Sequence, residues 1–204
     1  MWDAKETAGL HAEPQPPALG PRRFVAVAAL FYGTLLAAAI GWRAWADGVG
    51  PWRSGGPPLA EMGLFARLAV GLAFGALLIA LSRVWTARSA AGRALAAELG
   101  AVVAGISTWQ AVLLALLSGI GEEAFFRGAL QPEVGWLWAS LLFGLAHFHP
   151  RRELRVWSLA AALAGLGFGA LFDATGDLVA PAAAHALVNA VNLRWLARRG
   201  TARP

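Results

Sequence analysis

Five ionisable side chains stand inside long apolar runs of this sequence, where a charge is costly to bury. They are Glu122, Glu123, Arg127, His147 and His185, and Asn189 accompanies them as a neutral polar group. An ionisable group inside a membrane-spanning segment costs at least ~2.5 kcal/mol, so it is a functional candidate by default. Carboxylates and imidazoles are also the usual general acids and bases of enzymes. These residues are therefore the first candidates for catalysis.

The motif EEAFFR contains two carboxylates in different positions on a helix. Glu123 and Arg127 are four residues apart, so on a helix they share one face and can form an ion pair. The simpler interpretation of this pair is a structural salt bridge that pins the helix. Glu122 is rotated by about 100° from Glu123, which leaves it as a buried carboxylate without a partner on its own helix. Such a carboxylate can serve as a general base.

The histidines occur in two further motifs. His147 ends the run FGLAH, one helical turn after Phe143. A histidine near a helix end can also be a capping or interfacial residue, as we expect for His149. His185 and Asn189 are four residues apart in HALVN, inside an otherwise apolar segment. They can bond to a neighbouring helix as structural residues, although two polar groups on one face of a membrane helix favour a site.

The composition places these residues in a membrane. Of 204 residues, 58% are hydrophobic and only 14% are charged, whereas about a quarter of the residues in a soluble domain are charged. The mean hydropathy is +0.56. These values exclude a soluble enzyme and a disordered regulator, and the scattered Arg residues argue against a nucleic-acid binder. Because the chain has no Cys, it has no disulfide, no thiolate metal site and no Cys nucleophile.

Five or six segments are long enough to cross a bilayer as helices of about 20 apolar residues. We expect an all-α fold, a polytopic membrane bundle of about six transmembrane helices with a catalytic cavity at mid-membrane depth. The third segment is too long for one straight span, so it should start near Ser107 or break around 119–121. The pattern over 83–100 is typical of an interfacial amphipathic helix. The segments run near 24–41, 64–82, 101–130, 134–148, 156–172 and 178–196.

The chain divides into a disordered proline-rich tail (1–21), two spans with the interfacial helix (22–105), a catalytic core (106–196) and a basic tail (197–204). Thirteen of the 17 Lys and Arg residues fall in 1–23, in 83–100, in 148–155 or near the C-terminus. With six spans these residues lie on one side, so the positive-inside rule predicts that both termini are cytoplasmic. The excess of Arg over Lys is typical of a GC-rich bacterial gene, so we expect the bacterial inner membrane.

Counting residues from the predicted turns places the candidate catalytic residues at similar depths in the membrane. At 1.5 Å per residue, Glu122 lies roughly 15 Å before the turn near Pro132, and His147 lies roughly 22 Å after it. His185 and Asn189 lie about 12 Å and 18 Å past a second turn on the same side. Three helices thus carry four groups to overlapping mid-membrane depths. One shared site explains this better than scattered structural residues do.

In this order, the motifs EExxxR, FxxxH and HxxxN resemble those of the CPBP intramembrane endopeptidases, which include type II CAAX prenyl proteases and bacteriocin-immunity proteins. The resemblance covers residues 106–196. It implies a helical fold with a conical cavity and endoproteolysis of a membrane-tethered substrate. By position, Glu122 and His147 would activate a water, and His185 and Asn189 would donate hydrogen bonds to the developing oxyanion. Glu123 and Arg127, with Phe143, would hold the site in shape.

We expect no cofactor for this mechanism, in which water attacks the peptide directly. No Ser or Cys stands among the motif residues, so an acyl-enzyme has little support. The alternative is a zinc-dependent protease, because Glu122, His147 and His185 could supply the carboxylate and two imidazoles of a catalytic zinc site. The sequence has no HExxH motif, however, and with all three residues as ligands Glu123 would be the remaining candidate base.

The expected partners are the lipid bilayer and a membrane-anchored protein or peptide, and no nucleic acid. The substrate would be a C-terminal sorting segment or an anchored precursor of a bacterial protein. Three other functions compete with this prediction. One is a non-catalytic immunity or scaffold protein of the same fold, and another is a lipid hydrolase. The third is a proton-coupled transporter. The short chain and the lack of an inverted repeat argue against a transporter.

Overall fold

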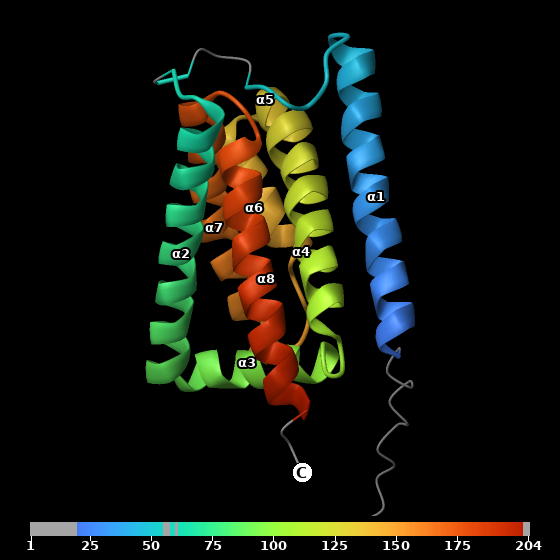
Figure 1. Cartoon of the computed structure of the whole chain (residues 1–204), viewed down its shortest axis with the longest axis vertical. Coiled ribbons are helices and arrows are strands. Elements are labelled where there is room, and N and C mark those ends of the chain that lie inside the picture. The colour runs from blue at the N-terminus through green and yellow to red at the C-terminus, as the bar shows by residue number, and fades with distance from the viewer. Residues whose placement is uncertain (1–19, 55–57, 60, 202–204) are drawn as a thin grey trace, which may run out of the picture.

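The computed structural model describes residues 20–54, 58–59 and 61–201, and it shows a bundle of helices joined by short loops (Figure 1). Most of the predicted N-terminal tail (1–19) and the last three residues of the predicted C-terminal tail lie outside the described residues. Within them, the β contact is a single isolated antiparallel bridge between Arg53 and Asp177. The predicted all-α fold class is therefore confirmed.

Eight α-helices and one π-helix follow one another along the described residues. α4, η1 and α5 run on without a break, so residues 108–134 form one long rod. The elements are α1 (Pro21–Ala46), α2 (Leu64–Arg88), α3 (Ala90–Val102), α4 (Thr108–Glu123), η1 (Ala124–Leu130), α5 (Gln131–Val134), α6 (Trp136–Ala146), α7 (Arg152–Thr175) and α8 (Val179–Thr201).

Four helical stretches in the described part of the chain are long and apolar enough to cross a membrane: α1, α2, Thr108–Val134 and Leu154–Thr175. α8 has 23 residues, but His185, Asn189 and its arginines make it less apolar. α6 has only 11 residues, about 16 Å, so it is shorter than the span predicted over 134–148. It cannot cross a hydrocarbon core of ~30 Å alone. The polytopic membrane bundle is confirmed, with four candidate spans among the described residues where about six were predicted.

A short helix closes one end of the bundle. α3 runs across the ends of the long helices in Figure 1, as expected for a helix that lies in the membrane interface. Its N-cap is Ser89, whose hydroxyl accepts a hydrogen bond from the backbone N–H of Gly92 at 3.3 Å. The interfacial helix predicted over 83–100 therefore begins later than expected, because α2 continues to Arg88.

The long third segment begins at a capping box, as the sequence predicts near Ser107. The Ser107 hydroxyl accepts a hydrogen bond from the backbone N–H of Gln110 at 3.2 Å, and the Gln110 side chain accepts one from the backbone N–H of Ser107 at 2.8 Å. This reciprocal pair satisfies two N–H groups at the start of a helix. Gly105, with φ of 79°, lets the chain turn from α3 into α4.

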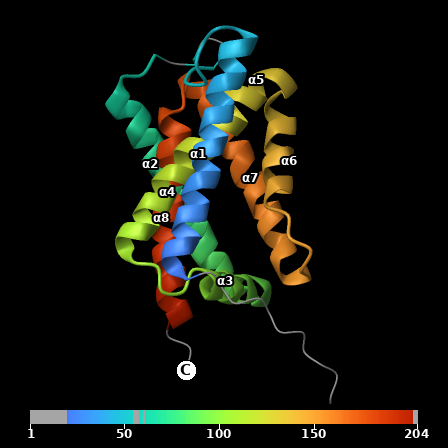
Figure 2. The same ribbon diagram turned by 90° about the vertical axis from the view of Figure 1, so that its right-hand side faces the viewer.

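α8 lies between α2 and α4 (Figure 1), and glycines allow it to approach both. A Cβ atom on Gly71 of α2 would lie 2.3 Å from the carbonyl oxygen of Ala180, and one on Gly119 of α4 would lie 2.9 Å from the backbone nitrogen of Ala186. Small residues at such contacts let helix backbones pack closely in a membrane. α6 and α7 stand on the other side of the molecule (Figure 2).

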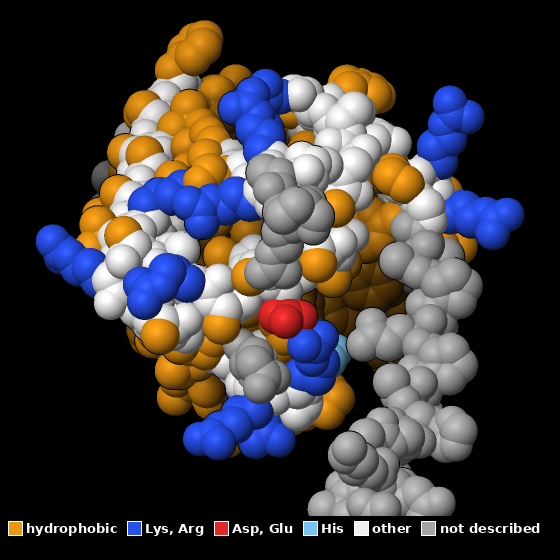
Figure 3. Space-filling view, turned by 90° about the horizontal axis from the view of Figure 1, so that it is seen from below, with side chains coloured by type: hydrophobic (Ala, Val, Ile, Leu, Met, Phe, Trp, Pro, Cys, Tyr) orange, Lys and Arg blue, Asp and Glu red, His pale blue; other side chains and the backbone are white. Residues whose placement is uncertain are grey.

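The two ends of the bundle differ in charge. At the end that carries the α1–α2 and α7–α8 loops, Arg43 pairs with Asp47 and Glu133, and Arg67 pairs with Asp177. The opposite end carries α3 and the end of α8. Viewed from that side, the molecule shows many Arg side chains around one visible acidic side chain (Figure 3). The positive charge is therefore balanced at one end and in excess at the other.

Candidate active site

The site begins at the last turn of α4, where Glu122 and Glu123 stand next to each other. Glu122 is 6% exposed and Glu123 is 0% exposed. Immediately after them the helix changes to the π-helix η1, which contains Arg127. π-Helical turns inside α-helices are frequent at functional sites. The change of helical geometry thus falls at the carboxylates themselves.

Arg127 and Glu123 form the ion pair that their spacing predicts. Arg127 Nη1 lies 3.1 Å from Glu123 Oε1, and both side chains are buried. Arg127 Nη2 donates a hydrogen bond to the carbonyl oxygen of Gly165 in α7 at 3.1 Å. The guanidinium also lies 4.3 Å from the ring centroid of Phe143 in α6. One buried cation therefore connects η1 to α6 and α7.

Glu123 also orients His185 of α8. His185 Nδ1 lies 2.7 Å from Glu123 Oε1, and the imidazole stacks on Phe168 with 5.1 Å between the ring centroids. An ionised carboxylate accepts hydrogen bonds only, so His185 Nδ1 carries the proton and donates it. This bond directs the other ring nitrogen, Nε2, toward Glu122, whose Oε2 lies 3.9 Å away.

His147 approaches the same carboxylate from the C-terminal end of α6. It is the C-cap residue of that helix, so it lies at a helix end and not within the span predicted over 134–148. Its Nδ1 donates a hydrogen bond to the carbonyl oxygen of Phe143 at 2.8 Å. Its Nε2 lies 3.8 Å from Glu122 Oε2. The ring of Trp157 in α7 packs against the imidazole at 5.2 Å between centroids.

Three polar atoms thus converge in the interior of the bundle: Glu122 Oε2 and the Nε2 atoms of His147 and His185. Glu122 Oε2 is buried and has no hydrogen-bond partner among the described residues. The separations of 3.8 Å and 3.9 Å are too long for direct hydrogen bonds. They suit one water, which can donate its two protons to two of these atoms at once.

The same three residues are the ligand set of the zinc-dependent alternative. Zinc bound tetrahedrally at 2.0–2.1 Å holds neighbouring ligand atoms about 3.3 Å apart, less than either carboxylate–imidazole separation seen here. In the part of the chain that the structure describes, no group of three His, Cys, Asp or Glu side chains has the arrangement of a metal site. As placed, the Glu122 and histidine atoms are therefore further apart than neighbouring ligands of a tetrahedral zinc ion.

Asn189 lies one turn beyond His185 on the same face of α8. Its Nδ2 donates a hydrogen bond to the Ser118 hydroxyl at 2.8 Å, and Ser118 lies one turn before Glu122 on α4. Ser118 in turn donates to the carbonyl oxygen of Ala115 at 3.2 Å. α4 and α8 therefore face each other through two polar pairs, Glu122 with His185 and Ser118 with Asn189.

The sequence analysis missed several residues around the site, and Tyr32 of α1 is the most informative. Its phenol lies beside the Glu122 carboxylate, within reach of a hydrogen bond. A Cβ atom on Gly121 would lie 2.7 Å from the Tyr32 backbone oxygen, so α1 packs closely against α4 at this point. The sequence did offer one signal for Tyr32: it is the single tyrosine of the chain, and it stands inside an apolar segment. Ser118, Trp157 and Phe168 were also missed, because no motif spacing marks them.

These features define a helical membrane protein with a buried carboxylate–imidazole site shared by α4, α6 and α8. Residues 104–191 match the family described as type II CAAX prenyl endopeptidase Rce1-like. This segment contains all the residues of the three motifs. The match confirms the resemblance inferred from the motifs. Because the family is one of proteases, the match supports a protease at the level of the family.

A curated relative gives a second, shorter similarity. The chain is 38% identical over 82 residues to the "Uncharacterized protein YpbD" of Bacillus subtilis (strain 168). The matched segment covers 39% of this chain and 42% of that protein, so the similarity spans less than half of either. No solved structure matches the chain.

Proposed function

We propose that this protein is an intramembrane endopeptidase that hydrolyses a peptide bond of a membrane-tethered protein with a water activated by Glu122 and His147. The observation that carries the proposal is the convergence of Glu122 Oε2 with the Nε2 atoms of His147 and His185, at 3.8 Å and 3.9 Å, within the bundle. The family match over 104–191 supports a peptide as the substrate class.

Glu122 acts as the general base in this mechanism. A water between Glu122 and His147 gives its proton to the carboxylate while its oxygen attacks the carbonyl carbon of the scissile bond. Glu122 then delivers that proton to the leaving amine as the C–N bond breaks. His147 Nε2 accepts the second hydrogen bond of the water, because its Nδ1 proton is bound to the Phe143 carbonyl oxygen.

His185 and Asn189 stabilise the negative charge that develops on the carbonyl oxygen. Asn189 uses one amide proton for Ser118 and offers the other to the substrate. His185 supplies an Nε2–H donor when it carries both ring protons, with Nδ1–H held by Glu123. Donors placed in advance around an oxyanion are commonly the largest electrostatic contribution to such reactions. Glu123, Arg127 and Phe143 hold these groups in position.

The substrate proposed is a C-terminal sorting segment or an anchored precursor of a bacterial protein, processed in the inner membrane. The basic end of the bundle, which carries α3, would face the cytoplasm. Direct attack by water is favoured over an acyl-enzyme, because the nearby Ser118 hydroxyl donates to the backbone carbonyl of Ala115 and not to a base.

The test is a cleavage assay with the purified protein in liposomes that contain a library of lipid-anchored peptides. Mass spectrometry would identify the products. Glu122→Gln keeps the shape of the side chain but removes the base, so it should lower the cleavage rate by at least ~10²-fold. Glu98→Gln makes the same change at a carboxylate that pairs with Arg151 on the surface and should leave the rate unchanged. Undiminished cleavage by Glu122→Gln would refute the proposal.

Metal removal tests the zinc-dependent alternative in the same assay. Because the water is activated by Glu122 and His147, dialysis against a chelator should leave the rate of the wild-type protein unchanged. Loss of activity on chelation, followed by recovery when zinc alone is returned, would establish the alternative.

A further inference from the structure

A polar cavity lies at the basic end of the bundle, between the start of α4 and the end of α8. Its volume is about 110 Å³. Two guanidinium side chains line it, Arg194 and Arg198, together with the hydroxyl residues Ser107, Thr108 and Thr201. Neither the motifs nor the proposed reaction uses any of these residues.

The lining of this cavity is cationic, with no carboxylate among its residues. Arg194 donates a hydrogen bond to the neutral hydroxyl of Thr108, and Arg198 lies one helical turn further along α8. At the opposite end of the bundle, by contrast, Arg43 and Arg67 are paired with carboxylates. The guanidinium groups of the cavity therefore keep N–H donors for an anion, and Arg matches the oxygens of a phosphate especially well.

More positive charge lies on the adjacent face of α8. The guanidinium groups of Arg83 and Arg199 both lie over the ring of Trp195, at 3.8 Å and 4.2 Å from its centroid. Four arginines thus surround the last turns of α8. Such a concentration raises the local affinity for anions beyond what one arginine provides.

The cavity also lies at the depth of a lipid headgroup. Counted from Val179 at the start of α8, Arg194 and Arg198 are about 23 Å and 29 Å along the helix axis. The hydrocarbon core of a bilayer is ~30 Å thick. The two guanidinium groups therefore reach the boundary where the phosphates of one leaflet lie.

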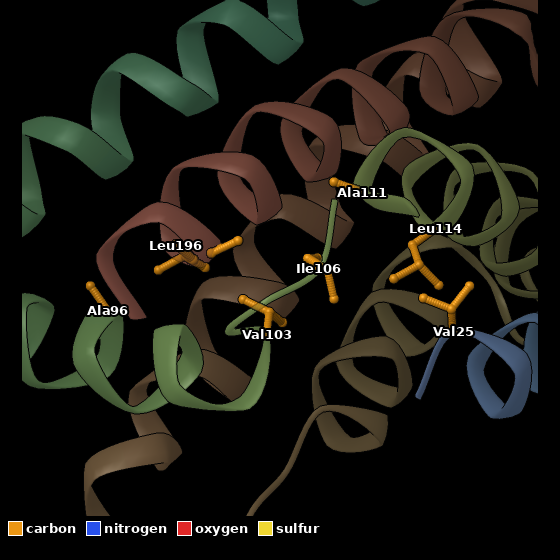
Figure 4. Close-up of a cluster of buried hydrophobic side chains, with 8 residues drawn as sticks. Val25, Ala96, Val103, Ile106, Ala111, Leu114 and Leu196 are labelled. Atoms are coloured by element: carbon orange, nitrogen blue, oxygen red, sulfur yellow. The ribbon is translucent and has the colours of Figure 1, made fainter. Parts of the chain in front are cut away.

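The floor of the cavity is apolar. Ile106 and Ala197 line it, and both belong to the buried cluster that joins α1, α3, α4 and α8. Figure 4 shows this cluster, with Ile106 between Val103 of the α3 end and Ala111 of α4. Cationic and hydroxyl groups at the rim over an apolar floor suit an amphipathic ligand better than a small, fully hydrated anion.

We propose that this cavity binds the headgroup phosphate of an anionic phospholipid. Arg194 and Arg198 contact the phosphate oxygens, and Ile106 and Ala197 face the glycerol and the first part of an acyl chain. Basic pockets between helices at the cytoplasmic side of a membrane are typical sites for anionic headgroups. The bound lipid would connect α4 to α8, the helices that carry Glu122 and His185. This proposal does not depend on whether the protein is a protease.

Native mass spectrometry of the full-length protein in detergent tests the site, with phosphatidylglycerol and phosphatidylcholine of identical acyl chains added in separate titrations. Wild-type protein should retain phosphatidylglycerol in preference. The double substitution Arg194→Gln/Arg198→Gln should weaken that binding roughly tenfold to thirtyfold, from the loss of two cations near the headgroup. The matched control is Arg22→Gln/Arg23→Gln, which removes the same charge from exposed residues at the same end and should leave the binding unchanged.

The proposal would be overturned by any of the following results. Equal weakening by the control pair would mean diffuse attraction to the basic end. Equal binding of phosphatidylcholine would mean that no anionic site exists. Displacement of the lipid by equimolar inorganic phosphate would mean a site for a free anion. If the double variant does not fold, Arg198→Gln alone changes one exposed side chain; a partial loss of phosphatidylglycerol binding supports the site, and unchanged binding overturns it.

Discussion

At the residue scale, the two histidines of the site are oriented in the same way. Each Nδ1 proton is donated to a fixed acceptor, the Glu123 carboxylate for His185 and the Phe143 carbonyl oxygen for His147. Each Nε2 is thereby directed toward Glu122 Oε2. The hydrogen-bond partner of one ring nitrogen determines whether the other nitrogen carries a proton. Glu123 and Phe143 therefore position the two Nε2 atoms without contacting the substrate.

Asn189 and Ser118 should differ in their effects, although they are bonded to each other. Asn189→Ala removes a proposed oxyanion donor and should lower the cleavage rate by ~10²–10³-fold. Ser118→Ala removes only the acceptor of the Asn189 amide, so the loss should not exceed roughly tenfold, the value of one neutral hydrogen bond. Cleavage rates of the two variants in liposomes give the comparison.

The reverse order of effects would change the account of the reaction. A severe loss in Ser118→Ala together with a nearly normal Asn189→Ala would indicate that the serine is the nucleophile.

Arg127 should affect stability more than any surface arginine. Arg127→Ala leaves the buried carboxylate of Glu123 without its cation, and breaking a buried ion pair costs about 3–5 kcal/mol. Thermal unfolding in detergent, followed by tryptophan fluorescence, should show a large decrease in the transition temperature. Arg88→Ala, at an exposed position, should unfold like the wild type. A stable but inactive Arg127→Ala would mean that the ion pair serves catalysis and not the fold.

Much of the site could be predicted at this scale, for simple geometric reasons. Helical spacing predicts the pair Glu123–Arg127, and it leaves Glu122 without a partner on its own helix, as the structure shows. Tyr32 could not be predicted in the same way, because its position beside Glu122 depends on how α1 packs against α4 at Gly121. No local spacing encodes a contact between distant segments.

At the scale of the elements, the site depends on how closely α8 approaches α4. The pairs Glu122–His185 and Ser118–Asn189 both cross this contact, and Gly119 lies between Ser118 and Glu122 at its centre. A side chain at Gly119 would meet the backbone of Ala186. The separation of these two helices therefore sets the distances within the site.

Gly119→Leu should separate α4 from α8. Forcing a large side chain into a packed contact costs about 1–3 kcal/mol, so we expect a lower unfolding temperature and a loss of cleavage. The matched control is Gly41→Leu in α1, where a Cβ atom would meet nothing within 4 Å and both properties should be retained. Normal activity of Gly119→Leu would show that the site tolerates a wider helix contact than the structure implies.

Some features of the helices could be predicted from the sequence, and others could not. The start of the long third helix followed from Ser107, because a capping box is a local signal. The π-helix at η1 was not expected, since a π turn has no strong sequence pattern, and Gly128 within it packs against another element. A Cβ atom on Gly128 would lie 2.1 Å from the Pro51 backbone oxygen, a contact between elements far apart in the sequence.

At the scale of the whole molecule, the distribution of charge predicts how the protein is oriented in the membrane. Arg43 and Arg67 at one end are paired with carboxylates, and the arginines at the other end lie on a largely basic face (Figure 3). Unpaired cations are retained on the cytoplasmic side. The face with α3 and the end of α8 should therefore be cytoplasmic, and the α1–α2 loop should lie outside.

Cysteine labelling tests this orientation cleanly, because the natural chain contains no cysteine. Leu59→Cys lies in the α1–α2 loop, where Leu59 is 88% exposed, and should react with a membrane-impermeant maleimide in right-side-out vesicles. Arg152→Cys, exposed at the start of α7, should react only after the vesicles are permeabilised. The opposite labelling pattern would invert the topology.

The central claim is that Glu122 activates water to cleave a membrane-tethered protein, and its most direct test is in the native host. The gene is deleted and replaced by the wild type, by Glu122→Gln or by Glu98→Gln, and the peptide termini in the membrane and secreted proteomes are quantified. We predict that the same precursor accumulates in the deletion and Glu122→Gln strains and is processed in the other two. Full processing in the Glu122→Gln strain would contradict the account, because the buried cluster would then serve structure or binding and not hydrolysis.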